Sequence, residues 1–316
     1  MRCVCCGRTI RGGGSGFGWH GSCVRAFFGT RDLPSLDIDD DTIKRLAEES
    51  TNKGYTVPGV QKKLSLHLSD PGDGDKPRLT LINYPAGFIL KPQTEEYKNL
   101  PEAEHLVMSM ARAARISVVP FALLDLKGKL AYITKRVDRK SEGGDVRLLA
   151  MEDFCQLDDR LTQDKYKGSY ERCAGIIKKF SCRPGLDLAE FFVRVVFSFA
   201  VGNSDMHLKN FSLIETDTGR YALSPAYDLL PVNVILPEDT EQLALTLNGK
   251  KRNIRKKDFT ALADNCGIPL PAAEKMISGI VACKETFFSL CDESFMPDEM
   301  KEKLKELITE RLKVLE

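Results

Sequence analysis

The sequence predicts an α+β protein, with a small β-rich lobe followed by a helical lobe and preceded by a small cysteine- and histidine-bearing module. Three observations predict this class. Short segments in the middle of the chain alternate apolar and polar residues with a period of two, which is typical of strands. Longer apolar segments with helical spacing dominate the second half. The first thirty residues are rich in Cys and Gly and nearly lack either periodicity. We therefore expect a module over 1–30, the β-rich lobe over 31–140 and the helical lobe over 141–316.

Composition excludes several classes of protein. The 316 residues carry 46 Lys and Arg against 45 Asp and Glu, so the formal net charge is +1. That balance gives no electrostatic footprint for direct binding of nucleic acid. No apolar run approaches the roughly 20 residues of a membrane helix, and no signal peptide is evident at the N-terminus. The ten cysteines are too scattered for a disulfide scaffold. We expect a cytoplasmic protein with no membrane contact.

The β-rich lobe is expected to begin with the segment Val60–Leu68, where leucines alternate with polar residues. A loop rich in Gly, Asp and Pro follows, at Asp70–Pro77. Further strands are expected at Leu79–Asn83, Phe88–Lys91, Val118–Leu124 and Lys129–Val137, the last two joined at a Lys-Gly turn. Between them, the segment Leu100–Ala114 has the spacing of a helix.

The helical lobe is expected to centre on the strongly apolar helix Leu186–Val201. A polar loop over Asn203–Asn210 follows it. A small hairpin is predicted next, from Phe211–Ile214 and Tyr221–Leu223. The remaining apolar spacing predicts helices at Lys257–Asn265, Pro271–Leu290 and Pro297–Leu315.

The polar loop carries the strongest chemical signal. Its sequence GNSDMHLKN places Asp205 and Asn210 with four residues between them, which is the spacing of the catalytic loop of protein kinases. One carboxylate there holds the acceptor hydroxyl in line with the γ-phosphate of ATP, and a nearby amide oxygen binds Mg²⁺. A second carboxylate must hold the metal, and Asp228, beyond the hairpin, is placed to supply it. Solvated loop residues are the simpler interpretation of Asp and Asn, but their place between a buried helix and a hairpin favours catalysis.

Two further residues of the loop have open assignments. A lone histidine is more often structural than catalytic, and we expect His207 to orient the loop backbone or Asp228. Lys209 is a candidate for a phosphate contact, with a merely solvated lysine as an equal alternative. The small sheet lobe, the helical lobe and this loop together predict a bilobal, protein-kinase-like fold.

Five motifs in order resemble the HipA-like serine/threonine kinases. They are VPGVQKKL, FILKP, KRVDR, GNSDMHLKN and LSPAYD, and the resemblance runs from about residue 51 to the C-terminus. The chain resembles the shorter HipT type, which lacks the extra N-terminal domain of HipA. The resemblance implies a bacterial toxin that phosphorylates an aminoacyl-tRNA synthetase and itself. It also implies a HipB-like DNA-binding antitoxin and a HipS-like small protein as partners.

By resemblance, Lys91 is the lysine that contacts the ATP phosphates. It needs a carboxylate partner, and Glu104 lies on the apolar face of the helix after it, with Glu102 as the less favoured alternative. The segment Thr56–Lys63 resembles the loop that covers the phosphates, which makes its residues Val57, Gly59, Gln61 and Lys63 candidates for nucleotide binding. Thr56 matches the autophosphorylated serine of the family. Pro58 stands where HipT relatives carry a second serine, so control at two sites is not expected.

The segment KRVDR resembles the hinge between kinase lobes. The resemblance implies that backbone groups of Lys135 and Val137 bind adenine and that Asp138 binds the ribose, with ATP between the lobes. The segment Glu152–Gln156 also resembles a family segment, but it carries no chemistry that we can assign, and we expect it to be structural.

The N-terminal module contains two candidate metal-ligand pairs. Cys3 and Cys6 form one, His20 and Cys23 form the other, and thirteen residues separate the pairs. This spacing is typical of tetrahedral Zn²⁺. Four protein ligands would leave no open position, so the zinc would be structural and would contribute to folding. A flexible cysteine-bearing tail is the alternative.

Three other functions compete with a protein kinase. A pseudokinase acting as a binding module would not need Lys91, Asp205, Asn210 and Asp228 together. A small-molecule phosphotransferase shares the Asp-to-Asn spacing, but the VPGVQKKL loop favours the HipA-like family. A zinc-finger DNA-binding protein fits poorly with the neutral charge. We therefore predict an ATP- and Mg²⁺-dependent serine/threonine kinase.

Overall fold

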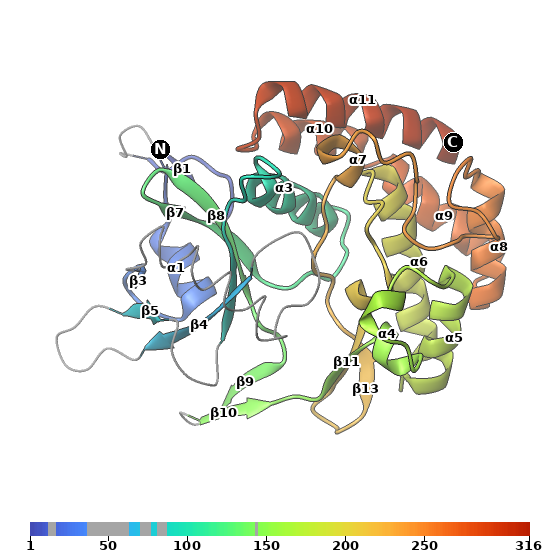
Figure 1. The fold of residues 1–316 in the computed structure, drawn as a ribbon, viewed down its shortest axis with the longest axis horizontal. Coiled ribbons are helices and arrows are strands. Elements are labelled where there is room, and N and C mark those ends of the chain that lie inside the picture. The colour runs from blue at the N-terminus through green and yellow to red at the C-terminus, as the bar shows by residue number, and fades with distance from the viewer. Residues whose placement is uncertain (12–16, 37–62, 70–76, 81–86, 143–144) are drawn as a thin grey trace. The chain divides into compact units, whose positions relative to one another are not determined.

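The computed structural model describes residues 1–11, 17–36, 63–69, 77–80, 87–142 and 145–316 (Figure 1). They form two compact units. The first contains Met1–His105 and Val119–Arg147, and the second contains Leu106–Val118 and Leu148–Glu316. The first is rich in strands and the second in helices, which confirms the predicted α+β class.

A six-stranded sheet forms the centre of the first unit. Its order is β3-β5-β4-β6-β8-β7, and every neighbouring pair is antiparallel except β3 with β5. The strands are β3 (Ser35–Leu36), β4 (Leu64–Ser69), β5 (Arg78–Thr80), β6 (Phe88–Lys91), β7 (Phe121–Leu126) and β8 (Lys129–Lys135). The predicted strand at Phe88–Lys91 is confirmed to the residue. The β7–β8 hairpin turns at Lys127 and Gly128, which confirms the predicted Lys-Gly turn. Both residues have positive φ.

The N-terminal segment packs on one face of this sheet. Two short parallel strands, β1 (Arg2–Cys3) and β2 (Phe17–Gly18), precede helix α1 (Gly21–Phe28). The helix buries Val24, Phe27 and Phe28 against apolar residues of β4, β6, β7 and β8. Helix α1 was not predicted from the sequence. Its apolar face spans only two turns, so the periodicity is too short to recognise.

Helix α3 (Leu100–Ala113) confirms the helix predicted at Leu100–Ala114. Its residues up to His105 belong to the first unit and the rest to the second. The apolar face is buried along the whole helix, including Val107, Met108 and Ala111. Two other strands, β9 (Arg139–Glu142) and β10 (Asp145–Leu148), pair with each other.

The second unit is built around the apolar helix α6 (Pro184–Ala200), close to the predicted Leu186–Val201. It contacts α5, α8, α9 and α11. A three-stranded sheet in the order β11-β12-β13 includes the predicted hairpin. The other elements are β11 (Met151–Asp153), α4 (Phe154–Leu157), α5 (Tyr170–Phe180), β12 (Ser212–Glu215), β13 (Tyr221–Leu223), α7 (Val232–Ile235) and α8 (Lys256–Cys266).

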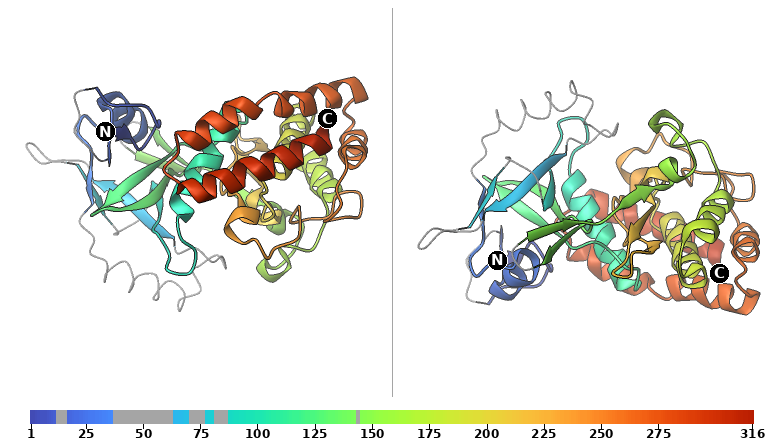
Figure 2. Two further views of the ribbon diagram at one scale, coloured as in Figure 1. Left: turned by 90° about the horizontal axis from the view of Figure 1, so that it is seen from above. Right: turned by 90° about the horizontal axis from the view of Figure 1, so that it is seen from below.

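The last part of the chain forms α9 (Leu270–Val281), α10 (Lys284–Asp292) and α11 (Asp298–Leu315). We expected one helix over Pro271–Leu290, and this was wrong, because the chain turns at Ala282 and Cys283. Helix α9 buries Ile277 and Ile280, and helix α10 buries Phe287. Because each helix keeps its own buried apolar face, the turn between them costs only a few backbone hydrogen bonds. Figure 2 shows α10 and α11 lying side by side. In the part of the chain that the structure describes, no helix has the length and apolar character needed to cross a membrane.

Candidate functional site

The segment from Asn203 to Asn210 follows α6 and leads into β12 through a short 3₁₀ turn, Leu208–Asn210. The chain leaves the helix at Gly202, where φ is +68° and a Cβ atom would lie 2.9 Å from the side chain of Leu307. Glycine adopts this backbone conformation without steric cost. Asn203, His207 and Asn210 are almost fully buried. The loop is therefore a packed structure rather than a solvated one.

Hydrogen bonds within the loop fix the two residues with the kinase spacing. The Asn210 side-chain amide donates to the Asp205 carbonyl at 2.8 Å. The backbone N–H of His207 donates to the same carbonyl, also at 2.8 Å. The Asp205 N–H donates to the Asn203 side chain at 3.3 Å. Because the amide nitrogen of Asn210 holds the loop, its amide oxygen is the atom that a cation would bind.

Neighbouring elements anchor the loop from outside. Ser204 donates to Asp239 at 2.6 Å, and the Asn233 side chain, from α7, donates to Ser204 at 3.2 Å. The buried hydroxyl of Tyr170, in α5, donates to the Met206 carbonyl at 3.1 Å. These bonds come from three separate segments, so the conformation of the loop does not depend on its own sequence alone.

Tyr166 is a residue of this site that the sequence did not indicate. Its hydroxyl donates to Asp205 Oδ1 at 2.5 Å, and its ring meets the His207 ring edge-to-face at 5.0 Å. Burial and the Asp205 carboxylate raise the pKa of Tyr166, so it stays a neutral donor. His207 Nε2 lies 3.9 Å from the same Asp205 oxygen. Tyr166 is 39 residues away in sequence and follows no motif, so no sequence signal could have identified it.

Lys209 lies against Asp153, with 2.5 Å between Nζ and Oδ2. Asp153 also caps helix α4, because its side chain accepts from the Gln156 N–H while the Gln156 side chain accepts from the Asp153 N–H. This capping box lies in the segment Glu152–Gln156, which we expected to be structural. Lys209 therefore ties the loop to β11 and α4 through an ion pair.

Asp228 has a left-handed backbone conformation, with φ at +60°. A non-glycine residue adopts this conformation at a cost and is often found at functional sites. The preceding residue fixes the segment, because the Tyr227 hydroxyl donates to the Lys209 carbonyl at 3.1 Å and shares a 2.5 Å hydrogen bond with Ser212. Tyr227 and Lys209 adjoin Asp228 and Asn210 in sequence, so this hydrogen bond ties together the chain segments that carry the two candidate metal ligands.

In the first unit, Lys91 forms an ion pair with Glu104, with 2.6 Å between Nζ and Oε1. Both side chains are buried, at 5% and 0% exposed. Lys91 Nζ also lies 5.3 Å from the centre of the Tyr132 ring. The alternative partner Glu102 instead accepts a hydrogen bond from Asn99, and burial raises its pKa. The structure thus pairs Lys91 with the carboxylate that the helical spacing favoured.

The hinge-like segment follows β8. The Lys135 N–H already donates to the Pro120 carbonyl at 2.9 Å, so its carbonyl is the backbone group left for a nucleotide contact. Asp138 accepts hydrogen bonds from Arg136 and Arg139 at 2.7 and 2.6 Å. Burial raises the pKa of Asp138, but the two arginines outweigh it and lower the pKa below its usual value. Val137 is partly buried beside it.

The candidate phosphate-covering loop is described only at its end. Thr56, Val57, Gly59 and Gln61 lie outside the described residues. Lys63 is partly buried and directly precedes β4.

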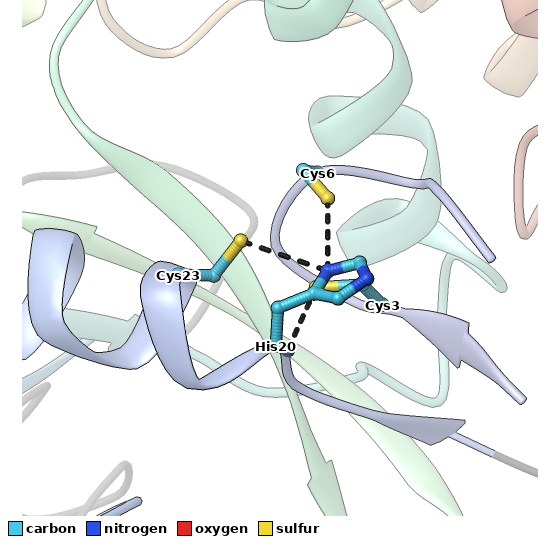
Figure 3. A group of neighbouring side chains, drawn as sticks. All are labelled: Cys3, Cys6, His20 and Cys23. Carbon is cyan, nitrogen blue, oxygen red and sulfur yellow. Dashed lines mark hydrogen bonds between the residues drawn. The ribbon is translucent and has the colours of Figure 1, made fainter. Parts of the chain in front are cut away.

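The four candidate metal ligands of the N-terminal module converge (Figure 3). Their ligand atoms all lie within 4.8 Å of one another. His20 Nδ1 is 3.5 Å from Cys6 Sγ and 3.9 Å from Cys23 Sγ, and the His20 N–H donates to Cys3 Sγ at 3.5 Å. Burial raises the pKa of Cys3, but backbone hydrogen bonds from Cys6 and His20 outweigh it and lower the pKa to about 7. The residues fit a soft divalent cation with thiolate and imidazole ligands.

Comparison with known proteins identifies the family. The family model of the HipA-like C-terminal domain matches residues 55–287. The chain belongs to this family. The resemblance stated from the five motifs is thereby confirmed. The N-terminal cysteine and histidine cluster lies outside the matched residues.

Two relatives and one solved structure define the relationship further. The chain is 34% identical over 259 residues to the putative kinase Y4dM of Sinorhizobium fredii, covering 74% of this chain and 61% of Y4dM. It is 25% identical over 253 residues to the serine/threonine-protein kinase toxin HipA of Shewanella oneidensis, covering 73% and 56%. The chain thus spans about three fifths of the length of these relatives.

The solved structure is a complex of the Shewanella oneidensis MR-1 toxin–antitoxin system, containing HipA, HipB and operator DNA. One of its chains superimposes with a TM-score of 0.66 and 20% identity, covering 85% of this chain and 70% of that one. At this identity, the likeness shows the fold alone, and it agrees with the predicted kinase-like architecture.

Proposed function

We propose that this HipA-like protein is a serine/threonine kinase that transfers the γ-phosphate of ATP to a protein and to itself. The observation that carries the proposal is the packed loop in which Asn210 donates to the Asp205 carbonyl. That bond supports a division of work in which Asp205 orients an acceptor hydroxyl and Asn210 presents an oxygen to Mg²⁺. The intact Lys91–Glu104 pair supports an active kinase rather than a pseudokinase.

In the proposed mechanism, each unit contributes its own groups. Lys91, held by Glu104, binds the ATP phosphates, and the segment Thr56–Lys63 covers them. Lys135, Val137 and Asp138 hold the nucleoside. Asn210 and Asp228 would hold Mg²⁺, which would neutralise charge on the phosphates. Asp205 orients the serine or threonine hydroxyl and takes its proton late, because phosphoryl transfer depends mainly on positioning and charge stabilisation.

The biological role that we propose is that of a toxin in a toxin–antitoxin pair. The support is the similarity to the Shewanella oneidensis toxin HipA, whose solved complex contains HipB and operator DNA. A HipB-like antitoxin is therefore the partner that we propose for this chain, and a HipS-like small protein is a second one to test by co-purification. The family resemblance makes an aminoacyl-tRNA synthetase the first substrate class to test.

The decisive experiment measures intact mass before and after incubation with ATP and Mg²⁺, for the wild type and Asp205→Asn. Protein that has first been treated with a phosphatase should gain the mass of phosphate only when Asp205 is present. Peptide mapping should place it at Thr56. Circular dichroism should show the same fold for both proteins. No gain by the unphosphorylated wild type, with or without candidate substrates, would rule out the proposal.

A further inference from the structure

The N-terminal cluster has the dimensions of a tetrahedral zinc site. Zinc bonds of about 2.3 Å to sulfur and 2.0–2.1 Å to nitrogen at tetrahedral angles place ligand atoms roughly 3.6–3.8 Å apart. His20 Nδ1 lies 3.5 and 3.9 Å from the sulfurs of Cys6 and Cys23. Rotations of a few side chains close the remaining gap, since all four ligand atoms already lie within 4.8 Å of one another.

A second, independent observation points to a metal. His20 Nε2 lies 3.3 Å from the Thr9 carbonyl, which can only accept a hydrogen bond. This contact favours the tautomer that carries its proton on Nε2, in which the lone pair of Nδ1 faces the sulfurs. A metal-bound histidine is oriented in this way by a carbonyl that accepts from its other nitrogen.

The cluster also holds the two elements that carry the Lys91–Glu104 pair. On one side, α1 begins immediately after His20, and its Phe27 and Phe28 pack on Phe88 of β6, with ring centres 5.7 and 5.5 Å apart. Phe88 lies in the same short strand as Lys91. The ligand Cys23 lies within α1, so a metal would fix the position of this helix on the sheet.

On the other side, the turn between Cys3 and Cys6 contacts α3. The Cys5 carbonyl lies 3.4 Å from Nε2 of His105, which adjoins Glu104 and is buried. The His105 ring also packs edge-to-face on Phe121 of β7 at 5.3 Å. In addition, the Val4 carbonyl accepts from the Leu123 N–H of β7 at 2.9 Å. The two elements that carry the buried ion pair, β6 and α3, therefore each contact a segment that also carries candidate ligands.

We propose that Cys3, Cys6, His20 and Cys23 bind one Zn²⁺ ion, and that this ion holds β6 and α3 in the positions that pair Lys91 with Glu104. The metal site is thus a structural clamp of the nucleotide-binding unit. The coupling to ATP rests on the function proposed above, whereas the metal site does not. The cluster precedes the residues matched by the family model, so it lies outside the HipA-like C-terminal domain of this chain.

Metal content tests the site itself. Elemental analysis of the purified wild type should find one zinc per chain, and Co²⁺ in its place should give the visible absorption of a tetrahedral thiolate complex. Cys6→Ser and Cys23→Ser should each lose the metal. Cys5→Ala is the matched control, because it removes a neighbouring thiol but no ligand and keeps the carbonyl that contacts His105. A wild type that holds no zinc and takes up neither Zn²⁺ nor Co²⁺ overturns the proposal, even where the serine variants fail to fold.

Hydrogen–deuterium exchange tests the clamp without any nucleotide. Reversible removal of zinc from the wild type by a chelator should speed exchange in Phe88–Lys91 and in the first turns of α3. Exchange in α9–α11 should stay unchanged, and reloading with zinc should restore slow exchange. Unaltered exchange at β6 and α3 in zinc-free protein would overturn the clamp while leaving the metal site intact.

Nucleotide affinity then tests the link to the proposed function. Calorimetry with ATP and Mg²⁺ should show about tenfold weaker binding after zinc removal, a typical size for coupling between two sites, with recovery on reloading. Equal affinity with and without zinc contradicts the coupling. If zinc-loaded wild type binds no ATP, the result contradicts the proposed kinase function instead. The metal site and the clamp are then still tested by the zinc content and by hydrogen–deuterium exchange.

Discussion

At the scale of single residues, the buried Lys91–Glu104 pair combines a stability role with the proposed catalytic role. Lys91→Met should destabilise the protein by about 3–5 kcal/mol, because it leaves the Glu104 carboxylate buried without the cation that it hydrogen-bonds. The double variant Lys91→Met with Glu104→Gln should recover much of that loss, since a neutral amide is less costly to bury. Chemical denaturation measures both effects.

Activity separates the two roles of this pair. The double variant should remain inactive in the phosphate-transfer assay even where its stability recovers, because the proposed phosphate contact requires the ammonium group of Lys91. If the double variant transferred phosphate at the wild-type rate, the Lys91–Glu104 pair would have a structural role only.

Tyr166 hydrogen-bonds the candidate catalytic residue Asp205, so we predict that it is a positioning residue. Its hydroxyl donates to Oδ1 of Asp205, whose side chain is 42% exposed. Tyr166→Phe removes one hydrogen bond to a charged group, typically about 1.5–3 kcal/mol, so kcat should fall roughly ten- to a hundredfold. The KM for ATP should stay unchanged. A variant with equal or higher kcat would instead indicate that the hydroxyl competes with the acceptor for Asp205.

At the scale of elements, the turn between α6 and the loop Asn203–Asn210 depends on one glycine. Gly202→Ala should destabilise the protein by about 1–2 kcal/mol, because a side chain at φ +68° is strained and its Cβ would lie 2.9 Å from Leu307. Gly175→Ala is the matched control. It lies within α5 with open space around its Cβ position, so it should stabilise the helix by about 0.5–1 kcal/mol. Thermal unfolding of both variants measures the contrast, and equal effects of the same sign would contradict the prediction.

Elements with a strong local pattern could be predicted from the sequence. The strand Phe88–Lys91, the helix α3 and the inward place of Glu104 on it all follow from spacing of apolar residues. The turn that divides α9 from α10 could not be predicted, because both halves continue the same apolar character. Helix α1 was missed because eight residues give too short a period, and only its contact with the sheet defines it.

The candidate site shows the same limit. The motifs indicated Asp205, Asn210 and Asp228, because their chemistry requires fixed residue types at short separations. Tyr166 and the Asp153–Lys209 pair could not be predicted, because these contacts join segments 39 and 56 residues apart. Which distant side chain reaches a loop depends on how the elements pack, and no single spacing encodes it.

At the scale of the whole molecule, the chain divides into two compact units, and the cluster of candidate metal ligands belongs to only one of them. The single tryptophan of the chain reports on that unit. Trp19 adjoins the candidate ligand His20, and the centre of its ring lies 5.7 and 5.3 Å from the centres of the Phe27 and Phe28 rings. Its fluorescence should therefore follow the first unit, whereas far-ultraviolet circular dichroism should mostly follow the helix-rich second unit.

We predict that zinc removal separates these two signals. A chelator should lower the midpoint of the fluorescence transition by several degrees or more, because the bound metal contributes directly to the stability of the unit that holds it. The midpoint of the dichroism transition should change much less, since none of the four ligands lies in the second unit. Cys182→Ser, a variant in that second unit, is the control and should keep the chelator effect. Fluorescence and dichroism that shift together by the same amount would show instead that the two units unfold as one cooperative body, so that the metal stabilises the whole chain.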